Sequence, residues 1–156
     1  MSSSLVETVD IEAPVAVAWE LWSDVTRWPR FLSHVSIVEP LGDRLFAWKL
    51  SLPGAEKNFV AELTEVVEED RIAWRTTEGV HHAGVVTFHR LSATTSRVTL
   101  QIEYDPHGFV ERLGALTNLD SVLANYDLGE FQKLAELRAA ALAGEDVGPV
   151  ETIEGA

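Results

Sequence analysis

Hydrophobic residues recur at helical spacing over one long stretch of the chain, from about residue 118 to residue 143. Its apolar positions, separated by three to five residues and close to one helical face, are Leu119, Leu123, Tyr126, Phe131, Leu134, Leu137 and Ala141. The opposite side carries Asp120, Asn125, Asp127, Glu130, Lys133, Glu136 and Arg138. We therefore predict one long amphipathic helix with a buried apolar stripe, because such a face must pack against another layer.

Seven other segments have the pattern of β-strands and are separated by short turn-like sequences. They are residues 5–12, 34–41, 44–52, 57–67, 71–77, 82–91 and 96–105. Short connections between consecutive strands indicate an antiparallel sheet. Two short helices are expected after the first strand, the first beginning near Pro14 and the second capped by Thr26. Another short helix is expected between residue 108 and residue 114.

Alternation along the strands predicts which side chains face the long helix. The inward set comprises Phe46, Trp48, Leu50, Leu52, Phe59, Ala61, Leu63, Val67, Ile72, Trp74, Thr76, Val98, Leu100, Ile102 and Tyr104. Glu65 falls on the same side as Leu63 and Val67 and is a candidate acid or base, because burial raises the pKa of a carboxyl group. The alternative is an exposed position at the end of its strand.

Length and charge limit the classes of function. The chain has 156 residues, and we expect one domain over residues 1–143 followed by a flexible acidic tail over residues 144–156. A net charge of −13 argues against nucleic acid as a partner, since nucleic acid is bound by clustered cations. The chain contains no stretch of 18 apolar residues, the length that a membrane-spanning helix requires. The N-terminus lacks the features of a secretory signal, so we expect a cytoplasmic protein.

Metal and thiol chemistry are disfavoured by the residues present. The chain contains no cysteine, which excludes disulfides and thiolate ligands. His81 and His82 are adjacent and would point to opposite faces of a strand, so they are poorly placed to share an ion. We interpret them as the solvated end of a hairpin and expect neither a metal nor another cofactor.

Five segments together resemble the SRPBCC or START-like superfamily, in particular its polyketide cyclase/dehydrase and coenzyme Q-binding branches. They are Ile11–Pro14, Asp24–Phe31, Asp70–Arg75, Ala83–Phe88 and Arg97–Pro106. The resemblance implies a bacterial protein with the α+β helix-grip fold, a curved antiparallel sheet around a long C-terminal helix. Aromatase/cyclases of this superfamily use inward polar groups, including an arginine on roughly the strand 57–67, where this chain has Leu63 and Glu65.

The resulting hypothesis is a cavity between sheet and helix that binds or carries a small hydrophobic molecule, such as a polyketide, an isoprenoid quinone or a lipid. The residues expected to line it are Trp28, Phe31, Trp48, Phe59, Trp74, Leu100, Tyr104 and Tyr126. Trp28 or Phe31 is expected near the mouth, and the phenol of Tyr104 or Tyr126 is expected to orient the ligand's oxygen-bearing end. The alternatives are an aromatase/cyclase and a protein-interaction module without a pocket. The sequence leaves the oligomeric state open.

Overall fold

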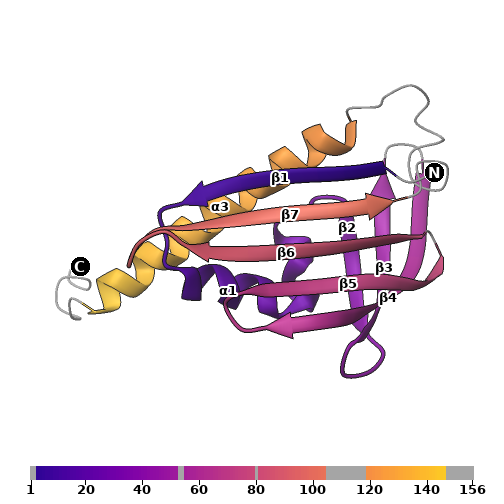
Figure 1. The fold of residues 1–156 in the computed structure, drawn as a ribbon, viewed down its shortest axis with the longest axis horizontal. Helices are drawn as coiled ribbons and strands as arrows, with labels where there is room; N and C mark the ends of the chain where they lie inside the picture. The colour runs from indigo at the N-terminus through magenta and orange to yellow at the C-terminus, as the bar shows by residue number, and fades with distance from the viewer. Residues whose placement is uncertain (1–2, 53–54, 80, 105–118, 147–156) are drawn as a thin grey trace, which may run out of the picture.

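A seven-stranded antiparallel sheet, two short helices and one long helix make up the computed structural model, which describes residues 3–52, 55–79, 81–104 and 119–146 (Figure 1). The elements in chain order are β1 (Ser3–Ile11), α1 (Val15–Ser23), η1 (Val25–Arg30), β2 (Val35–Pro40), β3 (Leu45–Leu52), β4 (Ala55–Val67), β5 (Arg71–Gly79), β6 (His82–Arg90), β7 (Ser96–Tyr104) and α3 (Leu119–Asp146). This order confirms the predicted fold class. The helix expected between residues 108 and 114 lies outside the described residues.

The sheet has the strand order β1-β7-β6-β5-β4-β3-β2, so every connection from β2 to β7 joins neighbours. β1 closes the meander by pairing with β7, from Ser3 opposite Tyr104 to Ile11 opposite Ser96. Figure 1 shows that the sheet curls, because β2 and β3 lie behind β5, β6 and β7 and run across their direction. The curl gives the sheet an inner face, which α1, η1 and α3 cover.

The two short helices form where they were expected, but the second has a different cap. α1 follows Pro14, which precedes the first helical residue and fixes an extended conformation there. η1 is a 3-10 helix capped by Asp24, whose Oδ1 accepts hydrogen bonds from Thr26 N at 3.1 Å and Thr26 Oγ1 at 2.6 Å. The prediction that Thr26 is the cap is therefore wrong. Thr26 is instead the donor to an aspartate two residues earlier.

The inner face of the sheet agrees with the alternation in β3, β5 and β7. Phe46, Trp48 and Leu50 are buried in β3, as are Ile72, Trp74 and Thr76 in β5 and Val98, Leu100 and Tyr104 in β7. The end of β4 departs from the prediction because Glu65 and Val67 are both exposed. The pairing of β4 with β5 shifts register between Leu63 and Glu65, and such an irregularity breaks the simple alternation of side chains.

The long helix is present but its buried face is not the predicted one. Tyr126 is 58% exposed and Leu137 is 70% exposed, and Ala141 is also exposed. The fully or largely buried positions are Ala124, Asp127, Leu128, Phe131 and Ala135, with Leu134, Ala139 and Leu142 partly buried. The true stripe is rotated from the predicted one by about one residue, or about 100°. The side chains of Leu119 and Leu123 lie outside the described part.

The rotation follows from the residues that pack best against β1 and α1. Small alanines at positions 124 and 135 let the helix approach closely, whereas the larger apolar residues Tyr126 and Leu137 face outward. Polar contacts fix the same orientation. Glu136 Oε2 accepts a hydrogen bond from Glu12 N at 2.9 Å, and Arg138 lies 3.3 Å from a Glu20 carboxylate oxygen. α3 extends to Asp146, three residues beyond the predicted end of the domain.

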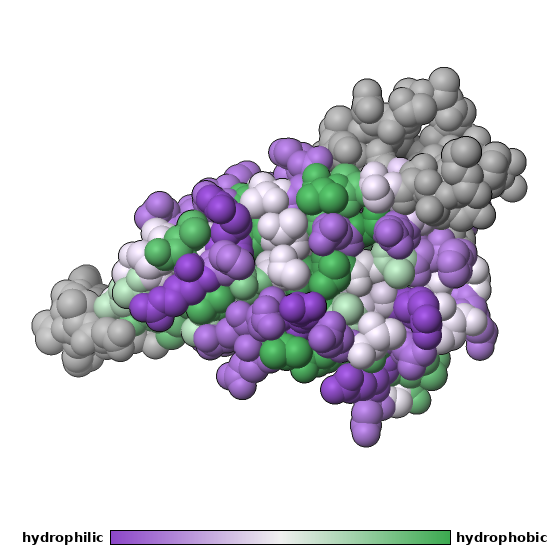
Figure 2. Space-filling model, viewed as in Figure 1, coloured by the Kyte–Doolittle hydropathy of each residue, from purple (hydrophilic) through white to green (hydrophobic). Residues whose placement is uncertain are grey.

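One side of the described surface shows no comparable separation of residue types. Hydrophilic side chains interrupt the apolar ones over the side of the molecule seen in Figure 2. Scattered apolar residues of this kind are normal on a protein surface. The dense apolar region of the molecule is therefore the inner face of the sheet.

Candidate functional site

Aromatic rings from three layers meet between the sheet and the helices. Trp28 of η1 is in edge contact with Trp48 of β3 at 5.2 Å and with Trp74 of β5 at 5.1 Å between ring centroids. Trp22 of α1 contacts Trp28 at 5.1 Å. On the sheet, Trp48 stacks on the cross-strand neighbour Phe59 at 5.6 Å with an interplanar angle of 16°. These five residues are named the aromatic cluster below.

Trp28 lies at the centre of the aromatic cluster and not at a mouth. Its side chain is buried, and its Nε1 donates a hydrogen bond to the carbonyl oxygen of Trp22 at 2.8 Å. Phe31 is buried as well, in contact with Trp22 at 4.8 Å and with Phe131 of α3 at 5.4 Å. The prediction that Trp28 or Phe31 stands at the opening is therefore not what the structure shows. η1 inserts Trp28 between two strands of the curled sheet.

The position of Trp74 depends on a glycine of the next strand. Gly84 of β6 pairs with Trp74 in the sheet, and a Cβ added at Gly84 would overlap the six-membered ring of the Trp74 indole. The indole therefore lies across the backbone of β6. This close approach explains a glycine within a strand, where glycine is otherwise unfavourable.

A polar group that the sequence interpretation dismissed lies beside Trp74. His82 is 5% exposed, and its Nε2 accepts a hydrogen bond from Trp74 Nε1 at 3.2 Å. The His82 backbone N donates to Thr76 Oγ1 at 3.1 Å, and the His82 ring is in edge contact with Phe59 at 4.6 Å. Tyr104 is the cross-strand partner of His82 and is also buried. A cluster of polar side chains thus borders the aromatic cluster at one end of β5, β6 and β7.

The interpretation of the histidine pair was right for one residue and wrong for the other. His81 is exposed, as expected for the end of a hairpin, whereas His82 faces inward. The signal in the sequence was the alternation of His82 with Val86 and Phe88, which places all three on one face of β6. Among the residues that the structure describes, no group of three or more potential ligands is arranged to hold a metal ion.

A second buried polar contact joins α3 to the segment after η1. Asp127 is 6% exposed, and its Oδ1 accepts hydrogen bonds from Ser33 N at 3.1 Å and Ser33 Oγ at 2.7 Å. Burial raises the pKa of the Asp127 carboxyl above its ordinary value of 3.8, an effect strengthened by Glu130 and opposed by Ser33 and His34. Asp127 was predicted to face solvent, and the structure corrects that prediction.

The other predicted site residues are divided between the interior and the surface. Leu100 and Tyr104 are buried on the inner face of β7. Tyr126 is exposed on α3, so the prediction that it lines an inner cavity is wrong. Glu65 is exposed and lies 3.7 Å from Arg71, which corresponds to the exposed alternative for this carboxylate. Arg71 also lies 3.8 Å from Asp70.

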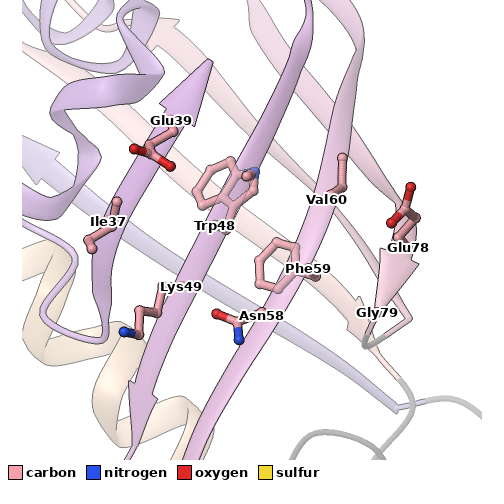
Figure 3. Close-up of a pocket in the computed structure, with 10 residues that line it drawn as sticks. Ile37, Glu39, Trp48, Lys49, Asn58, Phe59, Val60, Glu78 and Gly79 are labelled. Carbon is pink, nitrogen blue, oxygen red and sulfur yellow. The ribbon is translucent and has the colours of Figure 1, made fainter. Parts of the chain in front are cut away.

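An open groove of about 430 Å³ lies on the opposite, outer face of β2–β5 (Figure 3). Its lining consists of Ile37, Glu39, Ala47, Trp48, Lys49, Asn58, Phe59, Val60, Glu78 and Gly79. Trp48 and Phe59 are buried on the inner face, so the exposed surface of the groove comes mainly from their outward-facing neighbours. Small-molecule sites usually enclose most of their ligand, whereas this groove is open.

Comparison with known proteins identifies the family. Residues 11–131 match the family described as "Polyketide cyclase / dehydrase and lipid transport". The chain belongs to this family. It is 34% identical over 143 residues to an uncharacterized 17.2 kDa protein of Streptomyces lincolnensis, and the alignment covers 91% of this chain and 95% of that one.

Solved structures with similar folds include enzymes and proteins of no stated activity. The Zhui aromatase/cyclase of a Streptomyces strain has a TM-score of 0.73 at 18% identity, with 88% of this chain and 96% of that chain covered. A Deinococcus radiodurans protein has a TM-score of 0.70 at 24% identity, with coverage of 86% and 98%. A START superfamily protein of Mycobacterium smegmatis has a TM-score of 0.67 at 14% identity, with coverage of 89% and 98%. These likenesses establish the fold.

Within the described residues, none of the helices is long and apolar enough to cross a membrane.

Proposed function

We propose that this protein binds or carries a small hydrophobic molecule, such as a polyketide, an isoprenoid quinone or a lipid, between the inner face of the sheet and the helices, in the cytoplasm. The observation that carries the proposal is the aromatic cluster. Trp28 is in edge contact with both Trp48 and Trp74, and the ring of Phe59 is stacked on Trp48. Flat aromatic side chains of this kind provide large contact areas for a ring or a prenyl chain.

Binding at this place requires movement of η1, because Trp28 occupies the space between Trp48 and Trp74. η1 is short, and its neighbouring segment is held to α3 by the bonds between Ser33 and Asp127 and by the contact of Phe31 with Phe131. A displacement of η1 that withdraws Trp28 opens the inner face without unpairing a strand. The inner residues Leu100 and Tyr104 complete the proposed site from β7.

A titration with a soluble quinone tests the proposal. We expect saturable binding measured by calorimetry and a rise in melting temperature, because a ligand that binds only the folded chain stabilises it. Trp74→Ala removes one wall and should weaken binding by about tenfold or more. Ile37→Ser, on the outer groove, is the matched control and should leave the affinity unchanged. Equal losses for both variants, or binding affected only by Ile37→Ser, would move the site to the outer face.

Native mass spectrometry of the freshly purified protein identifies the class of ligand. A bound hydrophobic molecule that is absent from the Trp74→Ala variant would support the proposal. Failure of quinones, fatty acids and aromatic polyketides to bind would favour the interaction module instead.

An aromatase/cyclase activity is the second candidate, and the observation that favours it is the group of buried polar residues Thr76, His82 and Tyr104. His82 and Tyr104 are ionisable, buried and paired across β6 and β7, next to the proposed binding surface. Cyclisation of a poly-ketone chain needs groups that move protons beside a bound substrate. Turnover that His82→Ala abolishes and Glu65→Gln preserves would establish this candidate, since Glu65 is exposed and paired with Arg71.

A further inference from the structure

The indole nitrogens of the aromatic cluster are not all satisfied. Trp28 Nε1 donates to the Trp22 carbonyl oxygen, and Trp74 Nε1 donates to His82 Nε2. Trp48 is 5% exposed, yet in the described part of the chain its buried Nε1 has no hydrogen-bond partner. A buried donor without an acceptor is energetically unfavourable, so native proteins rarely leave one without a reason.

Trp22 is the useful comparison because its Nε1 also lacks a hydrogen-bond partner among the residues that the structure describes. Trp22 is enclosed by aromatic rings, with Phe31 at 4.8 Å and Phe131 at 5.5 Å, and the face of a ring is a weak acceptor for an N–H group. Trp48 also contacts two aromatic rings, Trp28 at 5.2 Å and Phe59 at 5.6 Å, but it differs from Trp22 in lying on the sheet, and the Phe59 ring is nearly parallel to it. It lies on the inner face of β3 beside Phe59, whose ring contacts His82, so it belongs to the surface proposed to bind the ligand.

We propose that Trp48 Nε1 is the ligand-orienting donor of the site and that the ligand carries an uncharged carbonyl oxygen on a flat apolar body. This inference rests on the proposed function. The stacked pair of Trp48 and Phe59 provides a planar surface for the body of the ligand, and the N–H group at its edge fixes the oxygen. The buried residues that the structure describes include no lysine or arginine, which makes a carboxylate or phosphate a poor fit. A ketone, quinone or ester meets both requirements.

The sequence analysis suggested the phenol of Tyr104 or Tyr126 as the group that orients the ligand's oxygen-bearing end. Trp48 replaces Tyr126 in this role. Tyr126 is exposed on the outer side of α3, and its hydroxyl is therefore remote from the inner face. Trp48 lies in the middle of β3 and is held by Phe59 on one side and Trp28 on another. A donor fixed by packing in this way loses little freedom when it binds an acceptor.

The test compares two probes of nearly equal shape, acetylnaphthalene and ethylnaphthalene, of which only the first has a carbonyl oxygen. We expect the wild-type protein to bind the ketone about threefold to tenfold more tightly, the range for one hydrogen bond in a buried site. Trp48→Phe keeps an aromatic ring but removes the N–H group and should abolish that preference. Trp19→Phe removes an indole N–H group outside the aromatic cluster and should leave the preference intact.

An independent readout uses the wild-type protein and does not depend on the stability of a variant. The chain has five tryptophans and therefore five indole N–H signals in a nitrogen–proton correlation spectrum. The Trp48 signal should move downfield with the ketone and not with the hydrocarbon. Equal affinities for the two probes with an unmoved Trp48 signal would overturn the inference and leave the proposed function standing. Absence of binding by either probe would overturn both.

Discussion

Strands β3 and β4 present two surfaces that differ in what covers them. On the inner face, Trp48 and Phe59 stack and are sealed by Trp28 from η1. On the outer face, the neighbouring positions Ala47 and Val60 pair across the same strands and remain partly accessible. Both surfaces contain apolar atoms, but among the described elements only those on the inner side form a second layer over the sheet.

The difference shows that apolar composition alone does not make a binding site. The outer groove is bordered by Glu39, Lys49 and Glu78, which stay in water. On the inner face water is excluded, so each polar group there has a large energetic effect and a defined direction. The N–H group of Trp48 and the ring of His82 are therefore better indicators of a binding site than the charged residues of the groove.

The comparison extends to the two sides of α3, where the largest effect is expected. Phe131→Ala removes a fully buried ring that contacts Trp22 and Phe31 and should lower the free energy of unfolding by about 3–5 kcal/mol. Tyr126→Ala, on the exposed side, should change it by less than about 0.5 kcal/mol. Urea denaturation measures both values. A larger loss of unfolding free energy for Tyr126→Ala would support the buried helix face that was predicted from the sequence.

The glycines Gly84 and Gly129 provide a second comparison, because the same substitution to alanine should change the stability of the fold in opposite directions at the two positions. Gly84→Ala places a methyl group against the Trp74 indole and should destabilise the fold by about 1–3 kcal/mol. Gly129→Ala, in α3, meets no heavy atom within 4 Å and should stabilise it by about 0.4–1 kcal/mol. Thermal unfolding of the two variants measures both changes in stability. If both variants destabilised equally, the close approach of Trp74 to β6 would not be the cause.

The smallest effect concerns a polar contact on the inner side of α3. Because the pKa of Asp127 is raised by burial, the folded chain favours its protonated form, and that stability is lost as pH rises from about 3.8 through the folded pKa. Asp127→Asn cannot ionise but still offers an oxygen to Ser33. Wild-type stability should therefore fall relative to Asp127→Asn as pH rises, which urea denaturation across this range would show. A relative gain with rising pH would mean that the Ser33 hydrogen bonds outweigh burial.

Local patterns in the sequence accounted for the strands and for most of their inward faces. Phe46, Trp48 and Leu50 alternate with polar or small residues, and one face of a strand needs nothing further to be recognised. The failures have a common cause. Val67 follows a register shift, and the face of α3 depends on where small residues such as Ala124 and Ala135 allow close packing. Neither feature can be read from periodicity alone.

Residue spacing along single strands and helices was enough to predict the order of the elements, the antiparallel sheet and the inward direction of Trp48, Phe59, Trp74 and Leu100. The hydrogen bonds that the inward groups make depend instead on how the strands and helices pack together. Trp48 and Trp74 have the same side chain and the same inward orientation. Trp74 reaches His82, a residue eight positions away, whereas Trp48 reaches no acceptor in the described chain. That distinction depends on contacts between strands, which no local pattern encodes.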